Sequence, residues 1–485
     1  MPGVVSCYAL GIPIYQINEW FTLMNRQSIN TIASILRHGV SILCGLILPH
    51  EILAHYGSEM NGLAHAISQF ISYTVLLELG IGAVIPAALY QPLATGDNRR
   101  ISAILSSGNR VFRRIAWIML AYILVLASIL PFTIGGTIPP ITVLMVLGCI
   151  SLGSVAHYIA GTPESLLLIS DQRGYIVYGI SIATMLVSTI LQVFLIRMGC
   201  VFAVVKLTAS VIAILHIFLI CLYVRRHYRL EKKVRYTDEP IPQKWDGAAQ
   251  HVAYFILENT DIILLTLLVS LKEVSVYSVY FMVINGIRSI FSTVSYNVQP
   301  KLGELQAKGE TEQLKVFFAS FEQRMHLIIT LAFGLMGILL IPFIQAYTSG
   351  IEDVNYVRPA FAILMSLAYG FQCVRDPYDK LILASGHFKQ TRHNYIIAAS
   401  LNMIISIIGI LFLGLEGAAI GTLVAMVYQF IFMMIYDSKV FLRRSVKPVL
   451  KLLLMDAVII LPFIFIGKKI QPTAFNIIST ILGNR

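Results

Sequence analysis

Three arginines interrupt long apolar stretches of this 485-residue sequence: Arg37, Arg288 and Arg375. A charge at the centre of a bilayer is costly, so such side chains face a bundle interior or water and mark pathways or binding sites. The guanidinium group is a planar fork that matches the geometry of phosphate oxygens. Three of these groups in one cavity would suit a pyrophosphate.

The arginines also have a structural interpretation, which the sequence leaves open. Arg375 precedes Asp379 by four residues, and Asp376 precedes Lys380 by four, so both pairs could form along one helix. Arg288 has no acidic residue within a turn of its own segment. Arg288 is therefore the better candidate for binding a ligand.

Two carboxylates lie three residues apart in the segment YFILENTDIILL, at Glu258 and Asp261. This spacing places them on one face of a helix. They are candidates for binding a coupling proton or sodium ion, and they could equally neutralise Arg288 in the next segment.

A third carboxylate, Glu78, is followed by Gly80, Gly82 and Pro86. Small residues let helices approach closely, and proline removes a backbone hydrogen bond. We therefore expect a bendable helix with a kink at Pro86 and a gating or coupling role for Glu78. The structural alternative is that Glu78 pairs with a neighbouring basic residue.

A helix restart is predicted in AGTPESLLL. Thr162 and Pro163 are residues of a helix start, and Glu164 follows in the first turn. The fourth apolar segment is therefore expected to be kinked at this point.

Composition places these residues in a membrane protein. Hydrophobic residues make up 57% of the chain and charged residues 13%, with mean hydropathy +0.77, whereas soluble proteins carry about 25% charged residues. The apolar runs do not alternate with polar residues as barrel strands do. We predict an all-α polytopic membrane protein. Its net charge of +11 reflects membrane topology, with no nucleic-acid partner expected.

No enzyme signature is present in the sequence. There is no Walker A loop, HExxH or GxSxG motif, and the histidines are dispersed without metal-ligand spacing. We expect neither a catalytic residue nor a metal nor a cofactor. Energy would come from an ion gradient or from the substrate gradient.

Apolar segments predict thirteen spans and a weaker fourteenth. They fall at 28–52, 62–90, 109–133, 138–170, 175–197, 199–224, 250–271, 274–298, 322–347, 357–385, 390–413, 416–440 and 447–467, with the weak one at 473–483. Alternate connections hold 24 Lys and Arg residues on one side and 3 on the other. The positive-inside rule places the N-terminus in the cytoplasm, and a final helix at 473–483 would return inward.

The chain divides into two halves of six spans each. We predict an N-terminal extension at 1–24, an N-lobe at 25–230, a cytoplasmic linker at 231–249, a C-lobe at 250–441 and C-terminal helices at 442–485. The loop LATGD after the second span weakly resembles the loop QAKGE after the eighth. Equal numbers of spans give parallel repeats around a central cavity, as in alternating-access transporters. Residues 1–23 lack a basic region, and we expect translation to begin at Met24.

The sequence resembles bacterial lipid-linked oligosaccharide flippases of the multidrug/oligosaccharidyl-lipid/polysaccharide exporter superfamily. The first matching motifs are Gly57…Gly62-Leu63, Glu78-Leu79-Gly80 and Pro92-Leu93…Asp97. A second set follows in the last helices of the C-lobe. It comprises Asn402, Ser406, Gly414-Leu415, Gly417, Gly421 and Thr422. The resemblance covers residues 25–440.

The resemblance implies two six-helix lobes facing a basic central cavity. The implied cargo is an undecaprenyl-pyrophosphate-linked repeat unit of O-antigen, capsule or exopolysaccharide. Membrane lipids, and polymerase and export proteins of the same pathway, are the implied partners, and a bacterial inner or plasma membrane is the implied location. Polar and aromatic side chains are candidates for sugar contact: Gln69, Tyr73, Tyr277, Tyr280 and Asn285.

Three other functions stay open. A multidrug or organic-cation exporter of the same superfamily would have an acidic cavity poor in arginine. A polysaccharide polymerase or ligase would carry a large outer loop, and the predicted outer loops are short. A lipid scramblase without ion coupling would need neither Glu258 nor Asp261.

Overall fold

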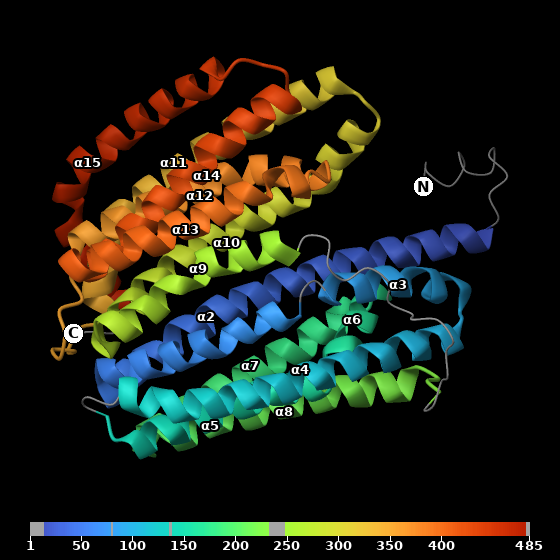
Figure 1. The fold of residues 1–485 in the computed structure, drawn as a ribbon, viewed down its shortest axis with the longest axis horizontal. Coiled ribbons are helices and arrows are strands. Elements are labelled where there is room, and N and C mark those ends of the chain that lie inside the picture. The colour runs from blue at the N-terminus through green and yellow to red at the C-terminus, as the bar shows by residue number, and fades with distance from the viewer. Residues whose placement is uncertain (1–13, 79–80, 135–137, 232–247, 482–485) are drawn as a thin grey trace. The chain divides into compact units, whose positions relative to one another are not determined.

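The computed structural model describes residues 14–78, 81–134, 138–231 and 248–481. Every element of secondary structure assigned within these ranges is a helix (Figure 1). The predicted linker at 231–249 lies almost wholly outside the described residues. Of the predicted N-terminal extension, residues 1–13 are outside as well, and the first helix begins at Ile14, upstream of Met24.

The helices follow one another with short connections. They are α2 (Ile14–Ser72), the 3₁₀ helix η2 (Tyr73–Leu77), α3 (Ile81–Thr95), α4 (Asn98–Thr133), α5 (Pro140–Ile159), α6 (Thr162–Ser170), α7 (Gly174–Arg197), α8 (Phe202–His227), α9 (Ala248–Leu268), α10 (Leu271–Ala307), α11 (Thr311–Tyr347), α12 (Pro359–Ala384), α13 (Phe388–Leu413), α14 (Leu415–Val440) and α15 (Lys447–Ile481).

Ten described helices are long and apolar enough to cross a membrane, which makes the chain a multi-pass membrane protein. The sequence predicted more spans, and the difference has physical causes. The first and second predicted spans are joined in α2, while α3 and α6 are short pieces of interrupted helices. Helix α12 carries buried charges that lower its hydropathy.

The first interruption lies in and after α2. Gly57 has φ +77° and ψ 177°, which breaks the helical path inside α2, and a positive φ of this kind favours glycine. The chain then tightens into η2 and turns at Glu78. Helix α3 continues through Pro86, and the kink expected there stays a prediction.

The predicted restart at Thr162 is confirmed. Gly161, with φ +99°, separates α5 from α6, and Pro163 occupies the first turn of α6. The carboxylate of Glu164 accepts a hydrogen bond from the Gly161 amide at 3.1 Å. Proline and a first-turn carboxylate suit a helix start because the first amides have no helical partner.

The predicted separate helix at 473–483 is wrong. Helix α15 continues without a turn from Lys447 to Ile481, through Pro462 and Pro472. Neither proline ends the helix, since a proline kink does not require reversal of the chain.

The chain forms two compact units. The first unit comprises residues 1–48, 77–127 and 145–245, and the second comprises 49–76, 128–144 and 246–485. Within the second unit, α13 packs on α14, α12 on α14, and α11 on α15. In the first unit, α7 packs on α8, and α3 on α6.

Glycines allow the closest helix contact of the second unit. A Cβ placed on Gly417 of α14 would overlap the backbone of Gly409 in α13, and one on Gly421 would overlap Ser406. Small residues at this spacing let two membrane helices approach closely. The glycine motif of the sequence therefore acts in packing α13 against α14.

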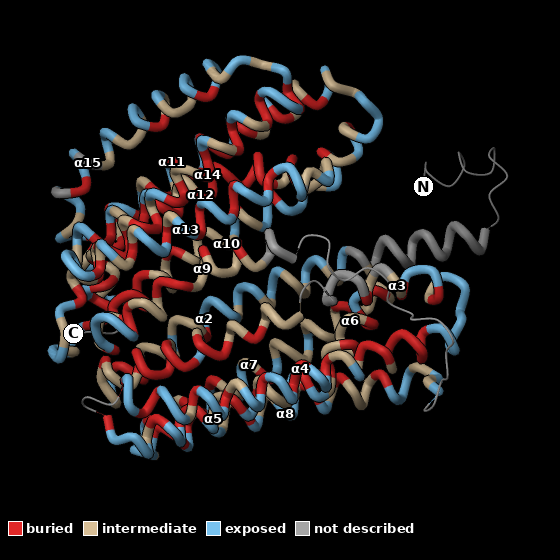
Figure 2. The backbone as a smooth tube through the Cα atoms, in the orientation of Figure 1, coloured by how far each residue is buried: buried red, intermediate tan, exposed pale blue. Residues whose placement is uncertain are grey.

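Large apolar side chains cover the outside of both units. Trp117 of the first unit is 73% exposed, and Phe412 of the second unit is 82% exposed. Figure 2 shows many exposed positions along α4 and α15, whereas α12 is mostly buried. This inverted pattern is expected where lipid replaces water as the solvent.

Candidate transport site

A cavity of about 310 Å³ lies within the second unit, between the end of α2, the middle of α9 and the first half of α10. Its lining residues are Gln69, Tyr254, Glu258, Asn259, Asp261, Ile262, Tyr277, Phe281, Asn285 and Arg288. Six of these were predicted as site residues from the sequence: Gln69, Glu258, Asp261, Tyr277, Asn285 and Arg288. The structure therefore gathers candidates from three helices at one place.

Arg288 is neutralised by Glu258. The two side chains form an ion pair and are 18% and 8% exposed. Gln372 of α12 closes the triangle, because its amide donates to Glu258 at 2.6 Å and its carbonyl oxygen accepts from Arg288 at 3.1 Å. Arg288 has no acidic partner within its own helix, as expected. Its counter-ion is Glu258 of α9, which was the alternative role considered for Glu258.

Aromatic rings surround the same guanidinium group. Its central carbon lies 5.9 Å from the ring centre of Phe281 and 5.4 Å from that of Tyr369. Such contacts stabilise a cation where water is excluded. Arg288 is thus held in place by one carboxylate, one amide and two rings.

Asp261 lies in a separate cluster of oxygen atoms. It is 5% exposed, and its Oδ2 accepts hydrogen bonds from Thr422 at 2.6 Å and from Tyr277 at 3.1 Å. Thr422 in turn accepts a hydrogen bond from the Asn402 amide at 3.1 Å. Among the described residues, Asp261 Oδ1 and Asn402 Oδ1 are buried and have no hydrogen-bond partner. Unsatisfied buried oxygens of this kind are costly unless a proton, water or cation reaches them.

Two of the tyrosines predicted to contact sugar do not line this cavity. Tyr73 is half-buried, with its hydroxyl 3.4 Å from Thr260 and its ring edge-on to Phe255. Tyr280 is fully buried; it donates to the carbonyl of Tyr356 at 2.8 Å. Tyr280 therefore stabilises the connection before α12, and its contact with a sugar stays a prediction.

Arg375 is also outside the cavity lining. It is 1% exposed, donates to Gln429 of α14, and pairs with Asp376 at 3.2 Å. Asp379 instead pairs with Lys380 at 2.8 Å. The predicted pairs four residues apart are wrong in detail, because neighbouring residues and a second helix supply the partners.

The remaining two candidates, Arg37 and Glu78, belong to the first unit. The guanidinium carbon of Arg37 lies 5.8 Å from the ring centre of Tyr178 in α7, and its buried Nε has no hydrogen-bond partner among the described residues. Glu78 accepts a hydrogen bond from the hydroxyl of Tyr158 at 2.6 Å. The expected basic partner of Glu78 is replaced by a neutral one.

Sequence reasoning missed Gln372 and gave no role to Asn402 or Thr422. Gln372 lies three residues before Arg375 and four before Asp376, so the polar stripe of α12 was a usable signal. Asn402 and Thr422 were visible only as parts of a motif. Among the described residues, no group of three or more His, Cys, Asp or Glu side chains is arranged to hold a metal ion.

Comparison with known proteins identifies the fold. No family model and no curated protein matches the sequence. The solved structure of the lipid II flippase MurJ in an inward closed conformation is similar, with a TM-score of 0.66 and 14% identity over 93% of this chain and 98% of that chain. The chain therefore shares the helical fold of that structure.

Two further solved structures are similar in fold. The eukaryotic MATE transporter AtDTX14 has a TM-score of 0.55 at 14% identity, covering 89% of this chain and 99% of that chain. An inward-facing multidrug resistance MATE family transporter of the MOP superfamily has a TM-score of 0.52 at 13% identity, covering 86% and 98%. At these identities the likeness shows the fold alone and leaves the role and the substrate open.

Proposed function

We propose that this protein is a flippase that moves undecaprenyl-pyrophosphate-linked oligosaccharide repeat units from the cytoplasmic to the outer leaflet. The observation that carries the proposal is the cavity of the second unit. A membrane-spanning bundle there presents carboxamides, aromatic rings and an arginine together. Carboxamides and rings suit sugars, the arginine suits a phosphate, and the MOP fold suits alternating access.

The three arginines are not equally available to bind the anionic headgroup. Arg288 can bind phosphate only by releasing Glu258, and this exchange of one anion for another keeps the guanidinium neutralised. Arg37 has a buried donor with no partner among the described residues. Arg37 is therefore the first-ranked pyrophosphate ligand in this proposal, with Arg288 second and Arg375 assigned to structure.

Coupling is assigned to Asp261. Its unpaired Oδ1, together with the unpaired Oδ1 of Asn402 and the hydroxyl of Thr422, supplies oxygen ligands suited to a hard cation. A proton on Asp261 would satisfy the same carboxylate. Either cation would link the charge state of α9 to the packing of α13 and α14, which supply the other oxygens.

The proposal places the protein in the bacterial inner or plasma membrane with its N-terminus in the cytoplasm. Short connections poor in Lys and Arg then face outward. Polymerase and export proteins that use the flipped repeat unit are the proposed partners, together with the membrane lipids that receive the polyprenyl tail.

A second candidate function is export of organic cations. The cavity of the second unit contains two carboxylates, Glu258 and Asp261, and one arginine that already has a counter-ion. A cavity balanced in this way accepts a cation more readily than one with three free arginines. The MATE structures named above make this the direct competitor.

Cells that lack the protein separate the two functions. Polyprenyl-linked lipids are extracted, identified by mass, and probed for the leaflet that exposes their glycan. A complete repeat unit accumulating on the cytoplasmic leaflet is the expected result. Unchanged glycolipids together with increased sensitivity to organic cations would overturn the proposal in favour of export.

A further inference from the structure

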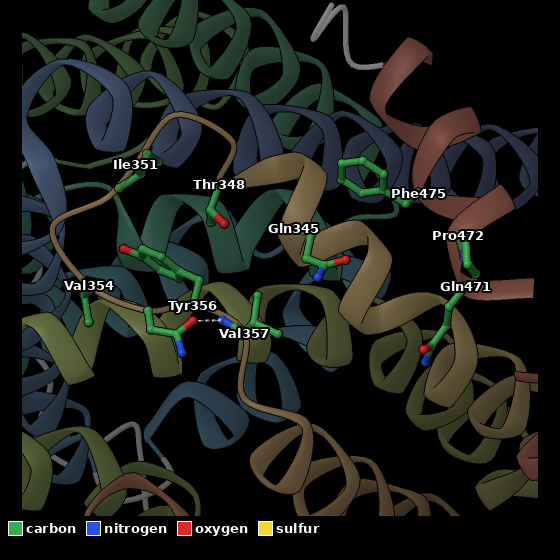
Figure 3. Close-up of a pocket in the computed structure, with 10 residues that line it drawn as sticks. Gln345, Thr348, Ile351, Val354, Tyr356, Val357, Gln471, Pro472 and Phe475 are labelled. Atoms are coloured by element: carbon green, nitrogen blue, oxygen red, sulfur yellow. Dashed lines mark hydrogen bonds between the residues drawn. The ribbon is translucent and has the colours of Figure 1, made fainter. Parts of the chain in front are cut away.

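A second cavity lies at one end of the second unit, away from the membrane-centre charges. Its volume is about 610 Å³, within the range of about 300–1,000 Å³ typical of small-molecule pockets. Figure 3 shows Gln345 and Thr348 from the end of α11, residues of the connection to α12, and Gln471 and Phe475 from α15 around it. The connection at 348–358 is one of those predicted to face outward.

Carboxamides are the principal polar groups of this pocket. They come from Gln345, Asn355 and Gln471. Among the described residues, the amides of Gln345 and Gln471 have no hydrogen-bond partner, and Asn355 uses only its oxygen, which accepts from the Val357 amide at 2.9 Å. Each carboxamide has both a donor and an acceptor, the combination that a pair of neighbouring sugar hydroxyls requires.

None of the described residues that line the pocket has a charged side chain. Burial raises the pKa of Tyr356 to about 12, so its phenol is neutral at physiological pH. The ring of Phe475 adds an apolar wall, and the face of an aromatic ring attracts the slightly positive C–H groups of a sugar. Neutral polar groups beside a ring favour an uncharged carbohydrate over a phosphate or an amine.

The 348–358 connection, which forms one wall of the pocket, is held by hydrogen bonds to α2 and α10. The hydroxyl of Tyr356 lies 2.7 Å from that of Ser58 and 2.8 Å from that of Ser275. Asp353 accepts from the Ser58 amide at 2.8 Å and from its hydroxyl at 2.6 Å. These bonds hold the wall before any ligand arrives, which reduces the entropy lost on binding.

We propose that the pocket between α11, the 348–358 connection and α15 binds a neutral sugar of the glycan on the outer side of the membrane. The inference rests on the proposed function, because export delivers the glycan to that side. The pocket would hold the delivered glycan after the central cavity has released it and so disfavour its return.

Binding of free glycan tests the pocket without requiring transport. The full-length protein is placed in lipid nanodiscs, and saturation-transfer NMR is recorded with the repeat-unit oligosaccharide released by mild acid from the host's own glycolipids. Maltotetraose serves as an unrelated neutral glycan. We expect saturable binding of the repeat unit, weakened at least about fivefold by Gln345→Ala and by Phe475→Ala. Gln313→Ala is the matched control, since Gln313 is an exposed glutamine at the other end of α11.

The possible outcomes separate this inference from the proposed function. Absence of repeat-unit binding, or binding unchanged in both pocket variants, overturns the pocket even if the protein moves glycolipid. Binding that is lost in the pocket variants and kept in Gln313→Ala supports the pocket. It does so even if the native protein moves no glycolipid in liposomes, a result that would overturn the function alone. Equal binding of maltotetraose through Gln345 and Phe475 supports a carbohydrate site that does not select the host glycan.

Discussion

Charged side chains inside the membrane have different kinds of partner in the two units. In the second unit, Arg288 and Arg375 each have a carboxylate partner and a carboxamide partner on other helices or neighbouring residues. In the first unit, the described contacts of Arg37 and Glu78 are with the neutral rings and hydroxyls of Tyr178 and Tyr158.

The difference separates structural charges from charges available to a ligand. A buried pair with further hydrogen bonds is costly to break, because either partner alone is an uncompensated charge. A guanidinium group against a ring keeps its hydrogen-bond donors for another group. The comparison therefore supports the proposal that Arg375 contributes to stability, that Arg288 has a mixed role and that Arg37 binds the ligand.

The largest expected effect is on stability. Arg375→Met removes the ion-pair partner of Asp376 in the buried core and should lower the free energy of unfolding by about 3–5 kcal/mol. SDS titration in mixed micelles measures it. Arg37→Ala is the control and should cost less than about 1 kcal/mol, the worth of a contact with one ring. Similar losses of unfolding free energy in Arg375→Met and Arg37→Ala would contradict the difference proposed between paired and unpaired arginines.

A double-mutant cycle at Arg288 comes next. Arg288→Met leaves Glu258 facing Gln372 without a cation and should cost about 2–3 kcal/mol. Adding Glu258→Gln removes the unpaired charge, so the double variant should regain at least about 1 kcal/mol in the same titration. Strict additivity of the two single losses would show that the ion pair does not contribute.

The break between α5 and α6 gives a smaller effect. Gly161→Ala puts a Cβ about 2.7 Å from Ile217 Cγ2 at a backbone φ of +99°, and the strain and overpacking should cost about 2 kcal/mol. Gly179→Ala in α7, where nothing lies within 4 Å of the added carbon, should change stability by less than about 1 kcal/mol. If both alanines are tolerated alike, the break does not depend on the glycine.

Arg37 should show a functional loss that stability does not explain. Arg37→Ala is expected to slow glycolipid flipping at least tenfold, about 1.4 kcal/mol, with normal abundance in the membrane. Arg37→Lys keeps the charge without the planar guanidinium group, and its flipping rate should lie between those of the native protein and Arg37→Ala. The flipping rate in liposomes is the measurement, and an unchanged rate in Arg37→Ala would remove Arg37 from the site.

Local chemistry made part of this structure predictable. The restart after Gly161 follows from Pro163 and Glu164, which act within one turn. Six residues of the cavity were found because charges and polar groups in apolar helices are conspicuous. The 3₁₀ helix at Tyr73–Leu77 was not predicted, because the residues there carry no proline or glycine to indicate it.

Contacts distant in sequence were not predictable. The partner of Arg375 is Gln429, 54 residues away, and that of Arg288 includes Gln372, 84 residues away. Helix periodicity gives the face of α12 that carries polar residues but does not show which neighbouring helix meets it. The choice between a free and a paired arginine therefore required the structure.

Reconstitution tests the central claim most directly. The purified protein is placed in liposomes with polyprenyl-pyrophosphate-linked glycan, and a membrane-impermeant reagent that oxidises sugars reports the leaflet of the glycan over time. The account predicts that glycan crosses only in liposomes containing protein, and that Arg37→Ala slows the crossing. Liposomes that take up a fluorescent organic cation against its gradient while the glycan stays on its original leaflet would contradict it.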